Sequence, residues 1–319
     1  MKKGEFGLID HIRATFATPP TGFVGIGDDC AIIAADGESD LLISTDMVIE
    51  GVHFLRNDAR PEDVGHKSAA VNISDIAAMG GEPVATFLSI ALPKDAQGEW
   101  VERFLEGYRA VSEQYGVSLL GGDTTSSLRD IAINVAVVGR CKRGEALLRS
   151  GAEVGDTIYV TGPLGDSGAG LKAILEGLER TPEVAALVER HYRPTPCVAE
   201  GRAIALSGAG HAMMDISDGI ASDLGHILRA SSVGAEVELD ALPISAELRS
   251  VATRKGWNIA ELAASAGEDY QLLVVGTADL PAKAGITLHP IGRITSGSGI
   301  VWLEGGEAVD FDKVGFKHF

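Results

Sequence analysis

Apolar positions in the first half of the chain fall into short runs that Gly and Pro separate. Runs rich in apolar and β-branched residues predict strands at 41–45, 84–92 and 131–139. Longer segments with apolar residues on one side predict helices at 4–16, 61–79 and 95–115. Pro61 begins the second of these helices, and Gly80 and Gly116 end the second and third. The first half therefore mixes helices with strands.

The pattern changes after residue 145. A polar segment punctuated by Gly, 148–156, leads into a predicted strand at 157–161. Helices then follow at 168–179, 183–190, 196–207, 219–230 and 245–255, and strands at 235–239, 270–275, 286–293 and 300–303. We expect two mixed domains of the α+β or α/β class, with residues 1–145 in the first and 146–319 in the second.

Composition narrows the choice of function. The 319 residues are 45% hydrophobic, which is enough for two cores, and the net charge is −18. Nucleic-acid binding needs a basic face, so this charge argues against it. The chain has no apolar segment of signal-peptide or membrane-spanning length, and its three cysteines form no CxxC pair. These features predict a cytoplasmic protein that does not bind membranes.

Candidate chemistry lies in short acidic motifs with small neighbours. Six such motifs are Gly25-Ile-Gly-Asp-Asp-Cys30, Ser44-Thr-Asp46, Asn72-Ile-Ser-Asp75, Gly121-Gly-Asp-Thr124, Asp215-Ile-Ser-Asp-Gly219 and Gly267-Glu-Asp-Tyr270. Mg²⁺ takes oxygen ligands and shares them with substrate phosphates. A bound divalent cation would also reverse the local charge that otherwise repels a phosphate. The motifs therefore favour a magnesium-dependent phosphoryl-transfer enzyme.

Asp75 is the most informative of these acidic residues. Val64, Val71, Asp75 and Ala78 share one face of the 61–79 helix. A carboxylate on an apolar face is costly unless it is paired or binds a metal. The pattern alone leaves two interpretations at even odds, a metal ligand or a buried Asp that caps a neighbouring loop.

The other motifs have ordinary structural interpretations as well. Asp28 and Asp29 could form a simple Asx-turn. Asp46 is expected at the end of a strand, where rigid scaffolds present functional groups. Ser217 or Asp218 could be the N-cap of the following helix.

Three further features of the sequence have alternative interpretations as well. The Gly-rich segment 165–172 fails the P-loop pattern because Leu171 separates Gly170 from Lys172, so an ordinary turn is favoured. His53 lies between apolar residues and is either structural or functional, since it is close in sequence to Asp46. Arg149, in the segment between the domains, either reaches a nucleotide phosphate or is a solvated linker charge.

Taken in order, the motifs resemble those of the thiamine-monophosphate kinase family, within the aminoimidazole ribonucleotide synthetase-like superfamily of ATP-binding proteins. The resemblance extends from Gly4-Glu-Phe6 to Gly315-Phe-Lys-His-Phe319. It implies transfer of the ATP γ-phosphoryl group to thiamine monophosphate, directly and in line. It also implies a homodimer in which the N-terminal sheets form a β-barrel core, with a second, sandwich-like α/β domain on each chain.

The resemblance further assigns roles to individual residues. Several Mg²⁺ ions would be held by Asp29, Ser44, Thr45, Asp46, Asp75, Asp123, Asp215 and Asp218. ATP would contact Gly122, Asp123, Arg149 and Ser217. Thiamine monophosphate would contact His53, Glu268 and Phe316. No residue is assigned as an acid, base or nucleophile, because a phosphate monoester is already a competent nucleophile near neutral pH.

Two alternatives remain open at this point. Another ATP-dependent synthetase of the superfamily would carry related acidic motifs, and would release phosphate. A non-catalytic nucleotide or metal sensor would be expected to lack one or more acidic ligands, and none is missing here.

Overall fold

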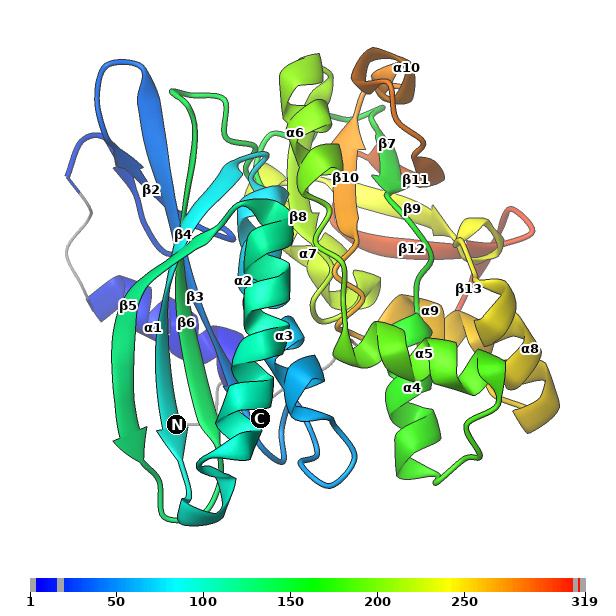
Figure 1. The fold of residues 1–319 in the computed structure, drawn as a ribbon. Coiled ribbons are helices and arrows are strands. Elements are labelled where there is room, and N and C mark those ends of the chain that lie inside the picture. The colour runs from blue at the N-terminus through cyan, green and yellow to red at the C-terminus, as the bar shows by residue number, and fades with distance from the viewer. Residues whose placement is uncertain (1–3, 16–19, 312–314, 316–319) are drawn as a thin grey trace.

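The computed structural model describes residues 4–15, 20–311 and 315, which form two mixed α+β domains (Figure 1). The first domain contains a six-stranded sheet with strand order β1-β2-β3-β6-β4-β5. Its strands are β1 (Phe23–Val24), β2 (Ala31–Ala34), β3 (Ser39–Ile49), β4 (Glu82–Leu92), β5 (Ser118–Ser126) and β6 (Ala132–Lys142). Neighbouring strands are antiparallel except for β4 and β5, which run parallel.

Two helices cover one face of this sheet. The helices of this domain are α1 (Gly4–Thr15), α2 (Pro61–Ala78) and α3 (Glu99–Tyr115), with a short 3₁₀ turn, η1 (Lys94–Ala96). Helix α2 packs against β3 and β6 on one side and against α3 on the other. The α2–α3 approach depends on Gly65, because a Cβ there would overlap the carbonyl oxygen of Phe104.

The second domain contains a seven-stranded sheet with order β13-β12-β9-β11-β7-β10-β8. Its strands are β7 (Thr157–Val160), β8 (Gly210–Asp215), β9 (Gly234–Glu238), β10 (Leu272–Gly276), β11 (His289–Thr295), β12 (Gly299–Glu304) and β13 (Glu307–Val309). Its helices are α4 (Asp166–Leu175), α5 (Pro182–Tyr192), α6 (Val198–Ser207), α7 (Ile220–Ser231), η2 (Leu239–Ala241), α8 (Ala246–Lys255), α9 (Ile259–Ser265) and α10 (Leu280–Ala284).

The central strands of the second sheet are buried on both faces. Successive side chains of a strand point to opposite faces. In β7, Ile158 and Val160 join the core that includes α7, whereas Tyr159 joins the core that includes α6 and α10. This double burial explains why β7 and β10 are continuous apolar runs.

Helix α2 lies between the two domains. Besides the first sheet, it contacts β8 and α6 of the second domain, as Figure 1 also shows. It is consequently buried around most of its circumference, including Lys67 and Ser74. This central position brings the C-terminal part of α2 against the end of β8, where the acidic motifs meet.

The expected barrel is not formed within one chain. The first sheet is open, and β1 and β5 lie at its two edges. Every residue of β5 is exposed, and apolar side chains including Met47, Phe87 and Leu120 remain exposed on the described part of this domain. A single sheet of six strands with one covered face does not close on itself, because closure needs its edge strands to be paired.

The described residues include no helix long and apolar enough to cross a membrane.

Candidate functional site

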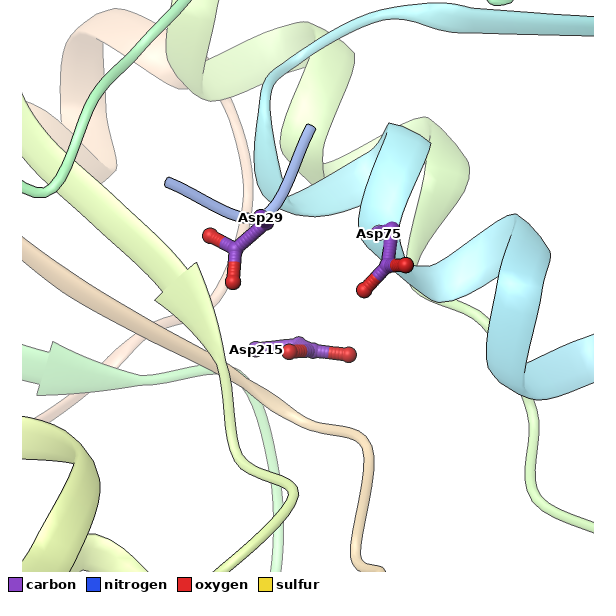
Figure 2. A group of neighbouring side chains, drawn as sticks. All are labelled: Asp29, Asp75 and Asp215. Carbon is purple, nitrogen blue, oxygen red and sulfur yellow. The ribbon is translucent and has the colours of Figure 1, made fainter. Parts of the chain in front are cut away.

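Three carboxylates from distant segments meet between the domains. Asp29 lies in the turn before β2, Asp75 on α2, and Asp215 at the end of β8. One oxygen from each lies within 4.8 Å of the others. Figure 2 shows the three side chains around one common space. This spacing suits ligands of a shared cation.

Neighbouring side chains hold the cluster in place. The Ser74 hydroxyl donates to Asp215 Oδ2 at 2.5 Å, so α2 supports the carboxylate of β8 directly. The side chain of Ser44 acts to lower the pKa of Asp75. Arg149 donates from Nη2 to Asp29 Oδ1 at 2.5 Å, and Arg149 N donates to Asp28 Oδ1 at 2.8 Å.

The electrostatics of the cluster favour a cation. Burial, and then the charge of Asp29, raise the pKa of Asp215 to about 7. The same two causes raise the pKa of Asp46 to about 6. Burial raises the pKa of Asp75 well above its usual range, followed by the charges of Asp46 and Asp215. Carboxylates this close cannot all ionise without compensating positive charge.

One carboxylate oxygen of the cluster has no hydrogen-bond partner among the described residues, and this bears on whether a metal ion fits. Asp29 Oδ2 is buried and has no hydrogen-bond partner among the residues that the structure describes. A buried carboxylate oxygen without a partner is costly. An all-oxygen donor set with a free ligand atom matches the preference of Mg²⁺, so the residues present fit this ion.

Asp75 contributes to this cluster as a metal ligand would. Its carboxylate faces those of Asp29 and Asp215. We propose on this ground that Asp75 is a metal ligand and not a loop cap.

A cleft of about 1210 Å³ surrounds the cluster. Most of the site residues predicted from the sequence line it: Asp29, Ser44, Thr45, Asp46, His53, Asp75, Arg149, Asp215, Ser217, Asp218 and Glu268. The cleft thus collects predicted metal, ATP and substrate contacts from both domains. Phe316 lies outside the described residues.

Two predicted site residues do not line this cleft. Gly122 and Asp123 lie on the exposed edge strand β5. Strands β6 and β4 separate β5 from β3, which carries Asp46. At about 4.8 Å per strand, Asp123 lies roughly 14 Å from β3 across the sheet. Within one chain, Asp123 is therefore remote from the other acids.

Two local predictions need correction. Asp46 lies inside β3, not at the end of a strand, because the strand continues past it to pair with β6 as far as Ile49. Neither Ser217 nor Asp218 is the N-cap of α7. The N-cap is Gly219, which has no side-chain capping bond, and the Asp223 carboxylate accepts from Asp218 N at 3.1 Å.

In the Gly267-Glu-Asp-Tyr270 segment, the two adjacent acidic side chains contact different groups of residues. The Asp269 carboxylate accepts from Gly165 N at 2.6 Å and from Ser167 N at 3.2 Å. It thereby satisfies backbone donors at the start of α4. The adjacent Glu268 points to a different group of side chains.

That group contains cleft residues that the sequence reasoning missed. Lys67 Nζ lies 2.7 Å from Glu268 Oε1, and His191 Nδ1 lies 3.4 Å from Glu268 Oε2. Lys67 could have been identified from the sequence, because helical periodicity places it on the apolar face with Val71 and Asp75. No comparable pattern in the sequence marks His191 as a cleft residue.

Comparison with known proteins places the chain in a family. Residues 27–141 match the N-terminal domain model of AIR synthase related proteins, and residues 153–303 match the C-terminal domain model. The thiamine-monophosphate kinase of Salmonella typhimurium is 39% identical over 100% of this chain and 99% of the relative. That of Aquifex aeolicus is also 39% identical, over 99% and 98% of the two chains.

Solved structures agree with this similarity. A structure described as AaThiL complexed with AMPPCP and TMP has a TM-score of 0.89 at 38% identity, covering 99% of this chain and 97% of the other. Similarity of this extent involves both domains and the cleft between them. The chain belongs to the thiamine-monophosphate kinase family.

Proposed function

We propose that this protein transfers the γ-phosphoryl group of ATP to thiamine monophosphate, giving thiamine diphosphate and ADP. The observation that carries this proposal is the meeting of Asp29, Asp75 and Asp215 in the cleft of a chain that matches the family over its full length. A related protein has been solved with AMPPCP and TMP, which supports the same pair of substrates here.

The proposed roles follow the position of each side chain. Asp29, Asp75 and Asp215 would hold magnesium, with Ser44, Thr45, Asp46 and Asp218 as further ligands lining the same cleft. Mg²⁺, when bound, neutralises phosphate charge and stabilises the charge that develops during phosphoryl transfer. Arg149 and Ser217 would contact ATP, and His53 and Glu268 would contact thiamine monophosphate.

The chain's own residues need only bind and orient. The acceptor phosphate, with a second pKa of about 6, is largely ionised near neutral pH and needs no strong general base. The side chains of the cleft would hold donor and acceptor in line, and positioning of this kind lowers the barrier without a covalent intermediate. We therefore propose direct transfer.

The proposal extends to the assembly. Gly122 and Asp123 are assigned to ATP and metal, yet they lie on the exposed edge strand β5. A second copy of the chain would reconcile these assigned roles with the position of β5. It could present its own β5 to this cleft and cover the apolar residues on the open sheet. We propose a homodimer with a shared barrel core, and a domain boundary near residue 145.

The test is a direct assay. The protein is incubated with ATP, Mg²⁺ and thiamine monophosphate, and the products are identified by mass spectrometry. We expect thiamine diphosphate and ADP in equal amounts, without free phosphate. Phosphate released without thiamine diphosphate would indicate a synthetase instead, and unchanged ATP would favour a sensor.

A further inference from the structure

Lys67 occupies an unusual position between the two domains. Its side chain is only 1% exposed, although it ends in an ammonium group. Nζ lies 2.7 Å from Glu268 Oε1 and donates to the carbonyl oxygen of His53 at 3.2 Å. An ammonium buried to this extent is costly unless it is paired and hydrogen-bonded.

The two partners of Lys67 come from different domains. His53 follows β3 in the first domain, whereas Glu268 precedes β10 in the second. Both are proposed contacts of thiamine monophosphate, and both line the cleft together with Lys67. One ammonium group therefore joins the acceptor contacts of the two domains.

The backbone around Glu268 is held in one conformation. Glu268 has φ of 63°, in the left-handed region that side chains other than Gly rarely adopt. Glu268 N donates to Ser217 O at 2.7 Å, and Tyr270 N donates to Ile216 O at 2.9 Å. Strained backbone held by surrounding contacts is typical of ligand-binding positions. Lys67 then fixes the carboxylate that this backbone presents.

The charges around Glu268 support a fixed anion. Burial acts to raise the pKa of Glu268, but the pKa is lowered overall, chiefly by the charge of Lys67 and by its hydrogen bond to the carboxylate. Burial, and then Lys67, lower the pKa of His191 to about 3, so this imidazole is neutral near pH 7. An ionised carboxylate suits an acceptor whose thiazolium ring carries a permanent positive charge.

We propose that Lys67 is a positioning residue that sets the arrangement of His53 and Glu268, and so determines affinity for thiamine monophosphate rather than for ATP. This inference rests on the proposed function. Lys67 acts through its two partners, and the phosphate-binding end of the cleft, around Arg149 and Asp29, does not depend on it.

The test separates the two substrates. KM for thiamine monophosphate, KM for ATP and kcat are measured for Lys67→Met, Lys67→Arg, Glu268→Gln and the double variant Lys67→Met/Glu268→Gln. We expect Lys67→Met to raise KM for thiamine monophosphate about 10- to 100-fold, as loss of one member of a buried charge pair does. KM for ATP and kcat should stay within about threefold of the wild type.

The double variant tests whether Lys67 acts through Glu268. The rise in its KM for thiamine monophosphate should be clearly smaller than the product of the two single rises, because coupled residues give non-additive effects. The double variant also removes both charges of the buried pair, so it can be measured even if Lys67→Met alone does not fold. In that case Lys67→Arg, which keeps the charge but moves the donors, should still raise KM for thiamine monophosphate selectively.

The control is Lys172→Met, which removes a lysine from the helix-surface pair with Glu176, outside the cleft. It should leave all three constants unchanged. Additive effects of the two substitutions, or an equal loss for both substrates, would overturn the role of Lys67. A wild-type protein that makes no thiamine diphosphate would overturn the proposed function itself, and the Lys67 inference with it.

Discussion

Arg149 donates from Nη2 to Oδ1 of Asp29 at 2.5 Å, although the two residues are 120 positions apart in the chain. Asp29 is nearly inaccessible, with its side chain 2% exposed, and it belongs to the three-carboxylate cluster. Arg149 is therefore the cation that partly compensates the cluster in the structure. It links the polar segment between the sheets to the acidic turn before β2.

This relationship predicts a magnesium-dependent loss of stability. Arg149→Met leaves the buried Asp29 without its cation, and should lower the free energy of unfolding of the metal-free protein by about 2–4 kcal/mol. Mg²⁺ should restore most of this loss because it supplies positive charge at the same carboxylates. Urea unfolding with EDTA and with Mg²⁺ measures both effects.

A matched control is Arg193→Met, which removes an arginine from the buried carboxylate of Asp63 outside the cleft. Its effect should not depend on Mg²⁺. If the loss in Arg149→Met were equally insensitive to Mg²⁺, Arg149 would not be a counter-ion of the metal cluster.

Asp75→Asn should lower turnover without lowering the free energy of unfolding. In the metal-free protein, Asp75 has a raised pKa among other acids, so an amide should leave the free energy of unfolding unchanged or increase it. Turnover should fall by about 100-fold or more, because a metal ligand is lost. Steady-state kinetics and thermal unfolding of the same preparation test the two effects together.

The control is Asp40→Asn, in the same sheet as Asp46. Asp40 is buried, accepts from Gly144 N at 3.0 Å and does not line the cleft. Its substitution should affect stability and not turnover. Near-normal turnover of Asp75→Asn at saturating Mg²⁺ would refute the ligand role.

Local patterns in the sequence were sufficient for many of the helices and strands and for the acidic motifs that contain the cluster residues. The face of α2 that carries Asp75 follows from helical periodicity, and the apolar run in β4 predicts a strand. The same periodicity places Lys67 on the helix face that carries Asp75. It was overlooked because a lysine in a helix is usually interpreted as a solvated residue, and only the burial of α2 between the two domains changes that.

Other features depend on tertiary contacts that no local pattern reveals. Strand β5 contains Gly121-Gly122 and is exposed throughout, so it lacks the apolar alternation of a strand. It forms because its backbone pairs with β4. Strand β8 was missed because its sequence, Gly-His-Ala-Met-Met-Asp, has no β-branched or aromatic residue typical of a strand. The meeting of Asp215 with Asp29 and Asp75 depends on the packing of the two domains.

The position of Asp123 predicts complementation between two inactive variants. If a partner's Asp123 completes each site, a dimer of one Asp123→Asn chain and one Asp75→Asn chain contains one intact site. With random subunit exchange, half of the dimers are mixed and half of their sites are intact, so about a quarter of wild-type activity should return. Each variant alone should be inactive.

The control pairs Asp75→Asn with Asp215→Asn. Both residues belong to the same cluster within one chain, so mixing these variants should restore no activity. If mixing Asp123→Asn with Asp75→Asn also restored nothing while subunits demonstrably exchanged, Asp123 would not serve a partner's site.

The lowered pKa of His191 predicts that the free energy of unfolding decreases at acidic pH. Its pKa is lowered to about 3 by burial and then by Lys67, whereas an unfolded histidine titrates near 6.5. Below pH 6.5 the unfolded state therefore binds a proton that the folded state does not. The stability contributed by neutral His191 is present above pH 6.5 and is lost as pH falls toward 3. At pH 5 the loss should be roughly 2 kcal/mol.

His191→Asn tests this directly, since the amide can replace Nδ1 near Ser167 and Glu268 but cannot take up a proton. Urea unfolding between pH 5 and 8 should show a flatter dependence for the variant than for the wild type. His11→Asn, which removes an exposed histidine, is the control. Parallel curves for His191→Asn and the wild type would mean that His191 takes up its proton in the folded state, and the buried group around Glu268 would then carry an additional positive charge at acidic pH.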